Sequence, residues 1–316
     1  MDPSKLELLQ APSLVWHFIP SIITNITHLP FVVDFDTGSS ELFLPGTRCT
    51  GANCRGHKVY NTGASTTASD AGRTFSLAFG DGSTVSGEQF SDTVTIGGLT
   101  ATGQRVGAAS TYSTGFALAN FPPDGLMGMG FPQISVFGAN PVFQTLVAQG
   151  KTTQSVFGFT LLPSGSELFL GGTDTSKISG SLTFTPVTQV GFWEITLGGV
   201  TVGGRSVAGS KDAIVDTGTT LVIGDSTSVR AIYAAIPGSK DASSTVGAGF
   251  FTVPCASVPS NVGLTLGGRT FTISAATFNL GQVSAGSRDC VGGIIADDSE
   301  PFWIIGDVFL QNVYTC

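Results

Sequence analysis

Short apolar runs alternate with polar turns along most of the chain. In the stretches TFSLAFGDGSTVSGEQFSDTVTIGG (74–98) and FWEITLGGVTVGGRSV (192–207), apolar side chains recur at every second position, the period of a half-buried β-strand. Gly-Gly and Asp-Gly pairs between such runs favour tight hairpins. The pattern therefore predicts a mostly β protein built from many short strands.

Helical patterns are few. PVFQTLVAQG (141–150) has a proline at its start, apolar residues at helical spacing and a glycine at its end, as short helices do. STSVRAIYAAIPG (226–238) is the second candidate. We expect a few short helices among the strands.

Length and charge narrow the class of protein. A chain of 316 residues exceeds a typical single domain, which favours two lobes, and 41% hydrophobic residues can fill two cores. The net charge of −8, with only 14 Lys and Arg, argues against nucleic acid or an anionic membrane as a partner. The same charge balance suits an acidic medium. Apolar runs are too short to predict a membrane span.

One sequence pattern occurs twice. FVVDFDTGSS (31–40) places Asp36 at the end of an apolar run, and AIVDTGTT (213–220) places Asp216 in the same context 180 residues later. A lone buried carboxylate is costly unless it is hydrogen-bonded or shares a proton. The repeat therefore predicts two similar β lobes that each supply one carboxylate to a common seam.

Two carboxylates at contact distance cannot both ionise easily, so such a pair holds one proton between them. The charged member can take a proton from a water molecule while the neutral member donates to a carbonyl oxygen. This is general acid-base hydrolysis of an amide bond without a covalent intermediate. Asp36 and Asp216 are the predicted catalytic residues.

From Phe31 to Tyr314 the chain resembles the pepsin-like aspartic endopeptidases, most closely their fungal secreted members. Besides the two DTG stretches, LMG (126–128) and IIG (304–306) match the paired apolar-apolar-Gly segments of that family. The resemblance implies a two-lobed acid protease fold with pseudo-twofold symmetry. It divides the chain into an atypical N-terminal segment 1–30, an N-terminal β lobe 31–185 and a C-terminal β lobe 186–316.

The resemblance also implies roles for individual residues. Residues that support the aspartates would be Thr37, Gly38, Ser39, Thr217, Gly218 and Thr219, with the two threonines hydrogen-bonded across the seam. FGDGS (79–83) would be the flap that closes over a bound peptide. Residues that bind substrate would be Phe79, Gly80, Asp81, Ser83, Leu126 and Ile214.

The resemblance implies no cofactor and no metal, and it implies a monomer that binds peptide or protein substrates and pepstatin-like inhibitors outside the cell or in a vacuole. Spacing alone leaves the five cysteines either as free thiols or as two disulfides with one cysteine left over. The resemblance favours the disulfides Cys49–Cys54 and Cys255–Cys290. Cys316 would then be unpaired.

Two departures from the family pattern affect the expectations. Phe79 and Phe43 occupy positions where the family usually has a hydrogen-bonded Tyr and Trp, so we expect an apolar contact between the two rings and an altered hold on the residue before the cleaved bond. The ends also differ: residues 1–30 show no family turn and no signal peptide, and we expect the C-terminal lobe to lack its last strand. Asn25 begins a glycosylation sequon.

Two other interpretations remain open at this point. A haloacid dehalogenase-like phosphatase would use Asp34 with Asp36, and Asp297 or Asp298, but it would need a parallel α/β sheet and magnesium. A second possibility is a protein of the same two-lobed fold that binds a peptide or inhibitor without cleaving it.

Overall fold

The computed structural model describes residues 23–26 and 29–316, with side chains from residue 29 onward. Of the predicted N-terminal segment 1–30, only residues 23–26 and 29–30 belong to the described residues. The side chain of Asn25 in the glycosylation sequon also lies outside them.

The N-terminal half of the described chain forms one seven-stranded sheet in the order β1-β2-β7-β3-β6-β5-β4. Along β5, buried and half-buried side chains alternate, as the period of two in the sequence predicts. The elements of this half are β1 (Ile23–Ile26), β2 (Leu29–Asp36), β3 (Leu42–Pro45), β4 (Ser69–Ala78), β5 (Thr84–Ile96), β6 (Leu99–Tyr112), β7 (Gly125–Gly128) and α1 (Val142–Ala148).

The C-terminal half forms two further sheets. The larger has the order β18-β17-β11-β13-β22-β14-β21, with β10 and β12 paired to β11, and the smaller has the order β15-β16-β20-β19. The strands are β10 (Val187–Val190), β11 (Trp193–Val202), β12 (Arg205–Ala208), β13 (Lys211–Val215), β14 (Val222–Gly224), β15 (Lys240–Asp241), β16 (Phe251–Pro254), β17 (Val262–Leu266), β18 (Arg269–Ile273), β19 (Asn279–Gln282), β20 (Asp289–Gly292), β21 (Ile294–Ala296) and β22 (Trp303–Ile305). The helices are α2 (Ser226–Ala234), α3 (Ala275–Phe278) and α4 (Asp307–Leu310).

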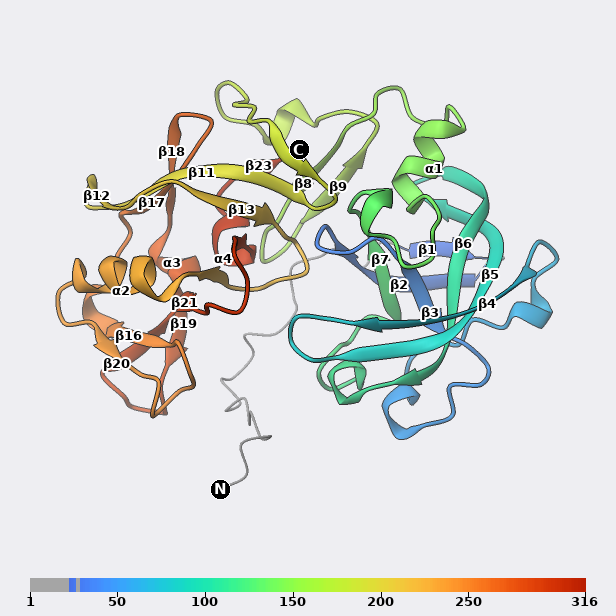
Figure 1. Ribbon diagram of the computed structural model, residues 1–316, viewed down its shortest axis with the longest axis horizontal. Coiled ribbons are helices and arrows are strands. Elements are labelled where there is room, and N and C mark those ends of the chain that lie inside the picture. Colours follow the sequence, from blue (N-terminus) through green and yellow to red (C-terminus); the bar gives the residue numbers. More distant parts are fainter. Residues whose placement is uncertain (1–22, 27–28) are drawn as a thin grey trace.

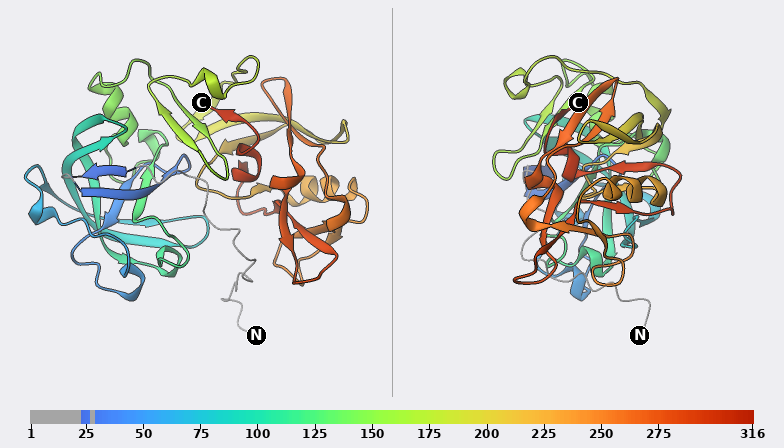
Figure 2. Two further views of the ribbon diagram at one scale, coloured as in Figure 1. Left: turned by 180° about the vertical axis from the view of Figure 1, so that it is seen from behind. Right: turned by 90° about the vertical axis from the view of Figure 1, so that its left-hand side faces the viewer.

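A small sheet of β8 (Phe157–Thr160), β9 (Glu167–Leu170) and β23 (Tyr314–Thr315) brings the end of the chain back against its middle. Figure 1 shows the lobe of β1–β7 on the right, the lobe of β10–β22 on the left, and this small sheet between them at the top. The view from behind in Figure 2 shows the same two lobes. The predicted lobe boundary at residue 185 falls between β9 and β10.

The main predictions of secondary structure are confirmed. The protein is mostly β and two-lobed, and the two predicted helices are α1 and α2. The hairpin between β5 and β6 turns at Gly97 and Gly98, whose φ angles are +53° and +82°, values that the mirror-image two-residue turn requires. Single turns of 3-10 helix occur at Ala52–Cys54, Thr62–Ala64, Thr114–Phe116, Pro132–Ile134, Thr175–Lys177 and Cys255–Ser257.

Large apolar side chains fill both lobes. Phe35 and Phe43 in the first lobe and Trp303 in the second are almost completely buried. The predicted disulfides Cys49–Cys54 and Cys255–Cys290 are both present. Cys316 is an exposed free thiol.

None of the helices in the described part of the chain is long and apolar enough to cross a membrane.

Candidate active site

Asp36 is the last residue of β2, and the strand beside it fixes its position. Strand β2 pairs in parallel with β7, with Asp36 opposite Gly128. The backbone N–H of Met129 donates to the carbonyl oxygen of Asp36 at 2.7 Å. The LMG segment therefore lies beside the strand that carries the first aspartate, and Met129, the residue after this segment, holds the main chain of that aspartate.

Asp216 has an equivalent position in the second lobe. It follows β13, which pairs in parallel with β22 and places Val215 opposite Ile305. The N–H of Asp216 donates to the carbonyl oxygen of Ile305 at 3.0 Å. The IIG segment therefore lies beside the second aspartate as LMG lies beside the first.

Each aspartate is held by the turn that follows it. Asp36 Oδ1 accepts a hydrogen bond from the N–H of Gly38 at 2.7 Å, and Oδ2 accepts one from the hydroxyl of Ser39 at 2.5 Å. Asp216 Oδ1 accepts from the N–H of Gly218 at 2.9 Å, and Oδ2 accepts from the hydroxyl of Thr219 at 2.6 Å. Both side chains are buried and hydrogen-bonded, which resolves the cost of placing a carboxylate at the end of an apolar strand.

The two carboxyl groups are neighbours across the seam. A Cβ atom added to Gly38 would lie within 3 Å of the Asp216 carboxylate, and one added to Gly218 would lie within 3 Å of the Asp36 carboxylate. The Cβ atom added to Gly218 would also lie 3.3 Å from Asp216 Oδ1. Each carboxylate thus contacts the glycine of the opposite turn, which explains why glycine is needed at both positions.

Two threonines join the lobes directly beneath this pair. The N–H of Thr37 donates to the Thr217 hydroxyl at 3.1 Å, and the N–H of Thr217 donates to the Thr37 hydroxyl at 2.9 Å. The Thr37 hydroxyl donates to the carbonyl oxygen of Val215 at 2.8 Å, and that of Thr217 donates to Phe35 at 2.5 Å. The hydrogen bonds across the seam that the resemblance implied are therefore present.

The electrostatic setting favours a bound proton. Burial is the largest influence that raises the pKa of Asp36 well above its usual value, and the Asp216 carboxylate raises that pKa further. The hydrogen bond from Ser39 opposes the shift by stabilising the charged form. The pair therefore retains a proton at pH values where an isolated aspartate would have lost it.

The predicted flap is the hairpin between β4 and β5. At its tip, the N–H of Phe79 donates to the carbonyl oxygen of Ser83 at 2.9 Å. Both carboxylate oxygens of Asp81 accept hydrogen bonds from Ser83, one from its N–H and one from its hydroxyl. The Asp81 side chain therefore shapes the tip, and contact between Gly80 or Asp81 and a substrate stays a prediction.

Beneath the flap lies a cluster of aromatic rings. The ring centroids of Phe43 and Phe79 are 6.1 Å apart, which confirms the predicted apolar contact. Phe116 packs edge-on against Phe43 at 5.4 Å and against Phe79 at 5.3 Å. This aromatic cluster anchors the base of the flap without the hydrogen bond that the family usually has there.

Three of the residues predicted to bind substrate are buried, namely Ser83 at the flap tip and two apolar residues on strands next to the aspartates. Leu126 is 4% exposed and Ile214 is 5% exposed. They lie on the strands beside Asp36 and before Asp216. Their packing supports these strands, and direct contact with a substrate stays a prediction.

Trp193, which is not among the predicted site residues, forms a second connection between the lobes. Its Nε1–H donates to the carbonyl oxygen of Met129 at 2.9 Å, and its ring packs at a tilt against Phe131, with the centroids 4.3 Å apart. The N–H of the same Met129 donates to Asp36, so Trp193 of one lobe is connected to the aspartate of the other. The only hint of this contact in the sequence was a tryptophan at the start of a strand with alternating apolar residues.

Three buried acids were also missed as parts of the site. Glu41 is 4% exposed and its Oε1 accepts from the N–H of Val136 at 2.6 Å, which holds the loop after β7. Asp34 and Asp307 are buried close to the two aspartates. In the sequence, Asp34 stands directly before Phe35 and Asp36 of the first repeat, and Asp307 stands directly after the IIG segment. An acidic residue at each of these places was the only indication of the two buried acids.

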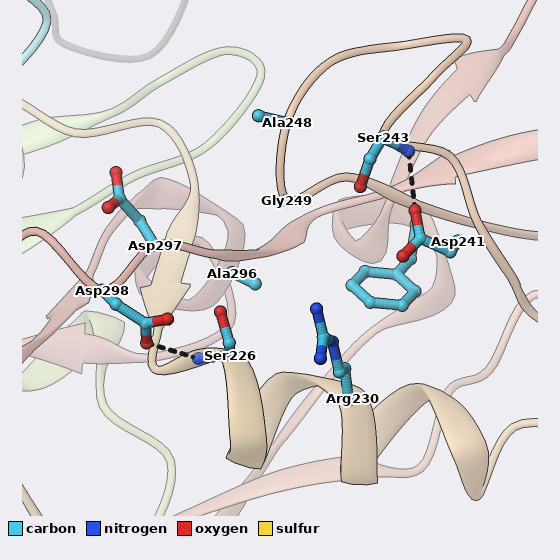
Figure 3. A pocket seen from close by; sticks show the side chains of 10 residues that line it. Ser226, Arg230, Asp241, Ser243, Ala248, Gly249, Ala296, Asp297 and Asp298 are labelled. Carbon is cyan, nitrogen blue, oxygen red and sulfur yellow. Dashed lines mark hydrogen bonds between the residues drawn. The ribbon is translucent and has the colours of Figure 1, made fainter.

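A separate pocket of about 320 Å³ lies in the C-terminal lobe between α2, the loop around residues 241–249 and the end of β21. Figure 3 shows the Arg230 side chain pointing into it from α2, with Asp297 and Asp298 at its edge. None of the predicted catalytic or substrate-binding residues lines this pocket. In the part of the chain that the structure describes, no group of three or more His, Cys, Asp or Glu side chains is arranged to hold a metal ion.

A two-lobed β fold that carries one DTG aspartate in each lobe defines the class of aspartic-type endopeptidases. The chain matches the model of the eukaryotic aspartyl protease family over residues 26–316, and it belongs to that family. It is 45% identical to an aspartic protease of Phaffia rhodozyma, in an alignment covering 90% of this chain and 70% of that protein. It is 36% identical to cathepsin E of Rattus norvegicus and 35% identical to pepsin A of Sus scrofa, again over 90% of this chain and over 73% and 74% of those proteins. The phosphatase interpretation is therefore wrong.

Proposed function

We propose that this chain hydrolyses peptide bonds in acid through a water molecule activated by Asp36 and Asp216. The observation that carries the proposal is the reciprocal contact of each carboxylate with the glycine of the opposite turn. That contact brings two acids from distant parts of the chain to one point on the seam. A pair in this position holds one proton between its members.

The proposed reaction uses the pair as both base and acid. The charged carboxyl group removes a proton from the water molecule, and the neutral one donates its proton to the carbonyl oxygen of the scissile bond. The water oxygen bonds to the carbonyl carbon and gives a tetrahedral diol. The carboxyl group that took the proton from water then donates it to the leaving nitrogen, and the carbon–nitrogen bond breaks. The other carboxylate takes a proton back from a diol hydroxyl, so the pair again holds one proton. No enzyme group forms a covalent bond to the substrate.

The surrounding residues fix the positions of the two carboxyl groups. The hydrogen bonds from Gly38, Ser39, Gly218 and Thr219 fix the four carboxylate oxygens before the substrate arrives. Groups fixed in advance need no reorganisation during the reaction, which is a main source of catalytic power. The threonine hydrogen bonds between the lobes keep the two turns in register.

The substrate is proposed to be an extended peptide or protein segment that lies between the lobes beneath the flap. Phe79, Gly80 and Asp81 would contact it from above, and the aromatic cluster would favour an apolar residue before the cleaved bond. Pepstatin-like inhibitors would occupy the same place. We propose further that the protein acts as a monomer, outside the cell or in a vacuole.

The proposal predicts an acid pH optimum with a defined sign. Activity requires the pair to carry one proton, so it is lost below the pH at which both members are protonated and above the pH at which both are ionised. Burial and the neighbouring charge raise the pKa of Asp36. The loss of activity on the alkaline side therefore occurs at a higher pH than it would with an ordinary aspartate. Without these shifts the active range would end near pH 4.

The test is an acid-pH digest of a denatured protein with and without a pepstatin-like inhibitor. Asp36→Asn and Asp216→Asn should each abolish inhibitor-sensitive cleavage, and both variants should unfold cooperatively, which shows that the loss is chemical. Cleavage that persists in either variant contradicts the proposal. Tight inhibitor binding by the wild-type chain without any cleavage would instead support the binding protein of the same fold.

A further inference from the structure

The loop between β7 and α1, residues 129–141, is fastened to the connection between β2 and β3. The N–H of Gly130 donates to the carbonyl oxygen of Ser39 at 2.7 Å. The hydroxyl of Ser40 donates to the carbonyl oxygen of Phe131, also at 2.7 Å. The start of the loop is therefore held by two residues of the turn that follows the first catalytic aspartate.

Glu41, the next residue of the same connection, holds the middle of this loop. Its Oε1 atom accepts hydrogen bonds from the N–H of Val136 at 2.6 Å and from the N–H of Phe137 at 3.4 Å. Burial raises the pKa of Glu41, and these hydrogen bonds oppose the shift. Because both N–H groups share one oxygen, the contact needs only one acceptor, which a neutral carboxyl group also supplies. The contact therefore persists in acid.

The internal repeat shows that an acid is not needed here for the backbone. The repeat of the two DTG stretches relates Glu41 to Leu221. The N–H of Gly128 donates to the carbonyl oxygen of Glu41 at 2.8 Å. In the second lobe the N–H of Gly306 donates to the carbonyl oxygen of Leu221 at 3.1 Å. An apolar residue is thus compatible with this backbone, and the side chain of Glu41 is explained by the loop that it holds.

Phe137 extends the contact from the loop to the flap. Its ring packs edge-on against the ring of Phe75 in β4, with the centroids 5.1 Å apart. Both rings are buried in the same apolar cluster as Phe43. A Cβ atom added to Gly107 of β6 would lie within 3 Å of both rings. Because the pair is tightly enclosed, a shift of Phe137 must move Phe75 or leave a gap beside it.

We propose that Glu41 is a positioning residue that fixes the flap relative to the catalytic pair, through the loop at Phe137 and the ring of Phe75. The first step joins the turn after Asp36 to the loop, and the second joins the loop to the flap strand β4. A flap that is already positioned in the free protein closes over a peptide at a lower cost in order. The inference rests on the proposed function because it takes the flap to close over a bound peptide.

The experiment compares the wild-type chain with two variants of Glu41. Glu41→Leu places the residue of the second lobe at this position, and Glu41→Gln keeps one acceptor oxygen. Hydrogen exchange of the backbone amides is measured in acid without substrate. In Glu41→Leu the amides of β4 should exchange roughly tenfold faster, and in Glu41→Gln they should stay within about twofold of the wild type.

Val136→Ala is the matched control. It shortens an exposed side chain of the same loop and keeps the N–H that Glu41 binds, so exchange in β4 should not change. Phe137→Leu tests the second step, because it removes the ring contact with Phe75 and keeps the hydrogen bonds to Glu41. Exchange should become faster in β4, and adding Glu41→Leu should increase it little further, since both changes act on one path. If Glu41→Leu does not fold, Phe137→Leu compared with Val136→Ala decides.

Wild-type exchange of β4 in Glu41→Leu, or equally fast exchange in Glu41→Leu and Glu41→Gln, overturns the inference. The KM for a peptide substrate should rise at least about fivefold in Glu41→Leu, with a smaller change in kcat, because a loose flap weakens binding. A fall in kcat with an unchanged KM also overturns the inference. Exchange is measured without substrate, so its result is independent of the cleavage test with Asp36→Asn and Asp216→Asn.

Discussion

Replacing Thr217 by valine tests whether the threonine network holds the seam between the two lobes together. Valine has nearly the same shape but lacks the hydroxyl, so the buried N–H of Thr37 loses its acceptor and the carbonyl oxygen of Phe35 loses a donor. An unsatisfied buried donor costs about 1–3 kcal/mol, and a lost hydrogen bond costs about 1 kcal/mol more. We therefore expect the free energy of unfolding to fall by about 2–4 kcal/mol, a large part of the roughly 5–15 kcal/mol of a typical domain.

The assay is urea unfolding at acid pH, together with kcat on a peptide substrate. Thr217→Ser is the matched control because it keeps the hydroxyl and removes one methyl group, which should cost about 1 kcal/mol. The valine variant should also lose at least about tenfold in kcat, because small misplacements of catalytic groups are expensive. Equal stability losses in the valine and serine variants, or a loss below about 0.5 kcal/mol in the valine variant, would refute the reasoning.

Three further predictions follow from single contacts. Trp193→Phe removes the hydrogen bond to Met129, so kcat should fall more than KM changes, and steady-state kinetics will show it. Phe79→Tyr places a hydroxyl group against the ring of Phe43, which offers no hydrogen-bond acceptor, so turnover or subsite preference should change. Unchanged turnover and identical cleavage patterns would show that the aromatic cluster does not hold the flap. Partial burial opposes ionisation of Asp225, but its hydrogen bonds lower its pKa overall, so the stability loss in Asp225→Asn should be full above about pH 4 and shrink below it, as unfolding at several pH values can test.

Local patterns in the sequence were sufficient for the outline of the fold and for the central pair. The hairpin at Gly97 and Gly98 and the helix α1 were predictable because a turn and a short helix depend on residues close together in the chain. The pairing of Asp36 with Asp216 was predictable because the repeated motif implied two equivalent lobes that meet.

Contacts between distant segments could not be predicted in this way. The hydrogen bond from Trp193 to Met129 spans 64 residues, and no local pattern specifies which carbonyl oxygen an indole will reach. The pairing of β23 with β8 joins segments more than 150 residues apart. The burial of Asp34 and Asp307 was equally hidden, because a charged residue beside an apolar run is usually at the surface.

The internal repeat explains which details carry the most information about function. Two lobes with the same local pattern should place the same kinds of side chain at equivalent points, and the glycine, hydroxyl and threonine contacts of the two aspartates follow this rule. A departure from the rule needs its own physical reason. Asp34 and Asp307 replace an apolar pair inside a seam where burial is costly for a charge. Packing alone would favour the apolar pair on both sides, and the burial of the two acids instead raises the pKa of each above its usual value.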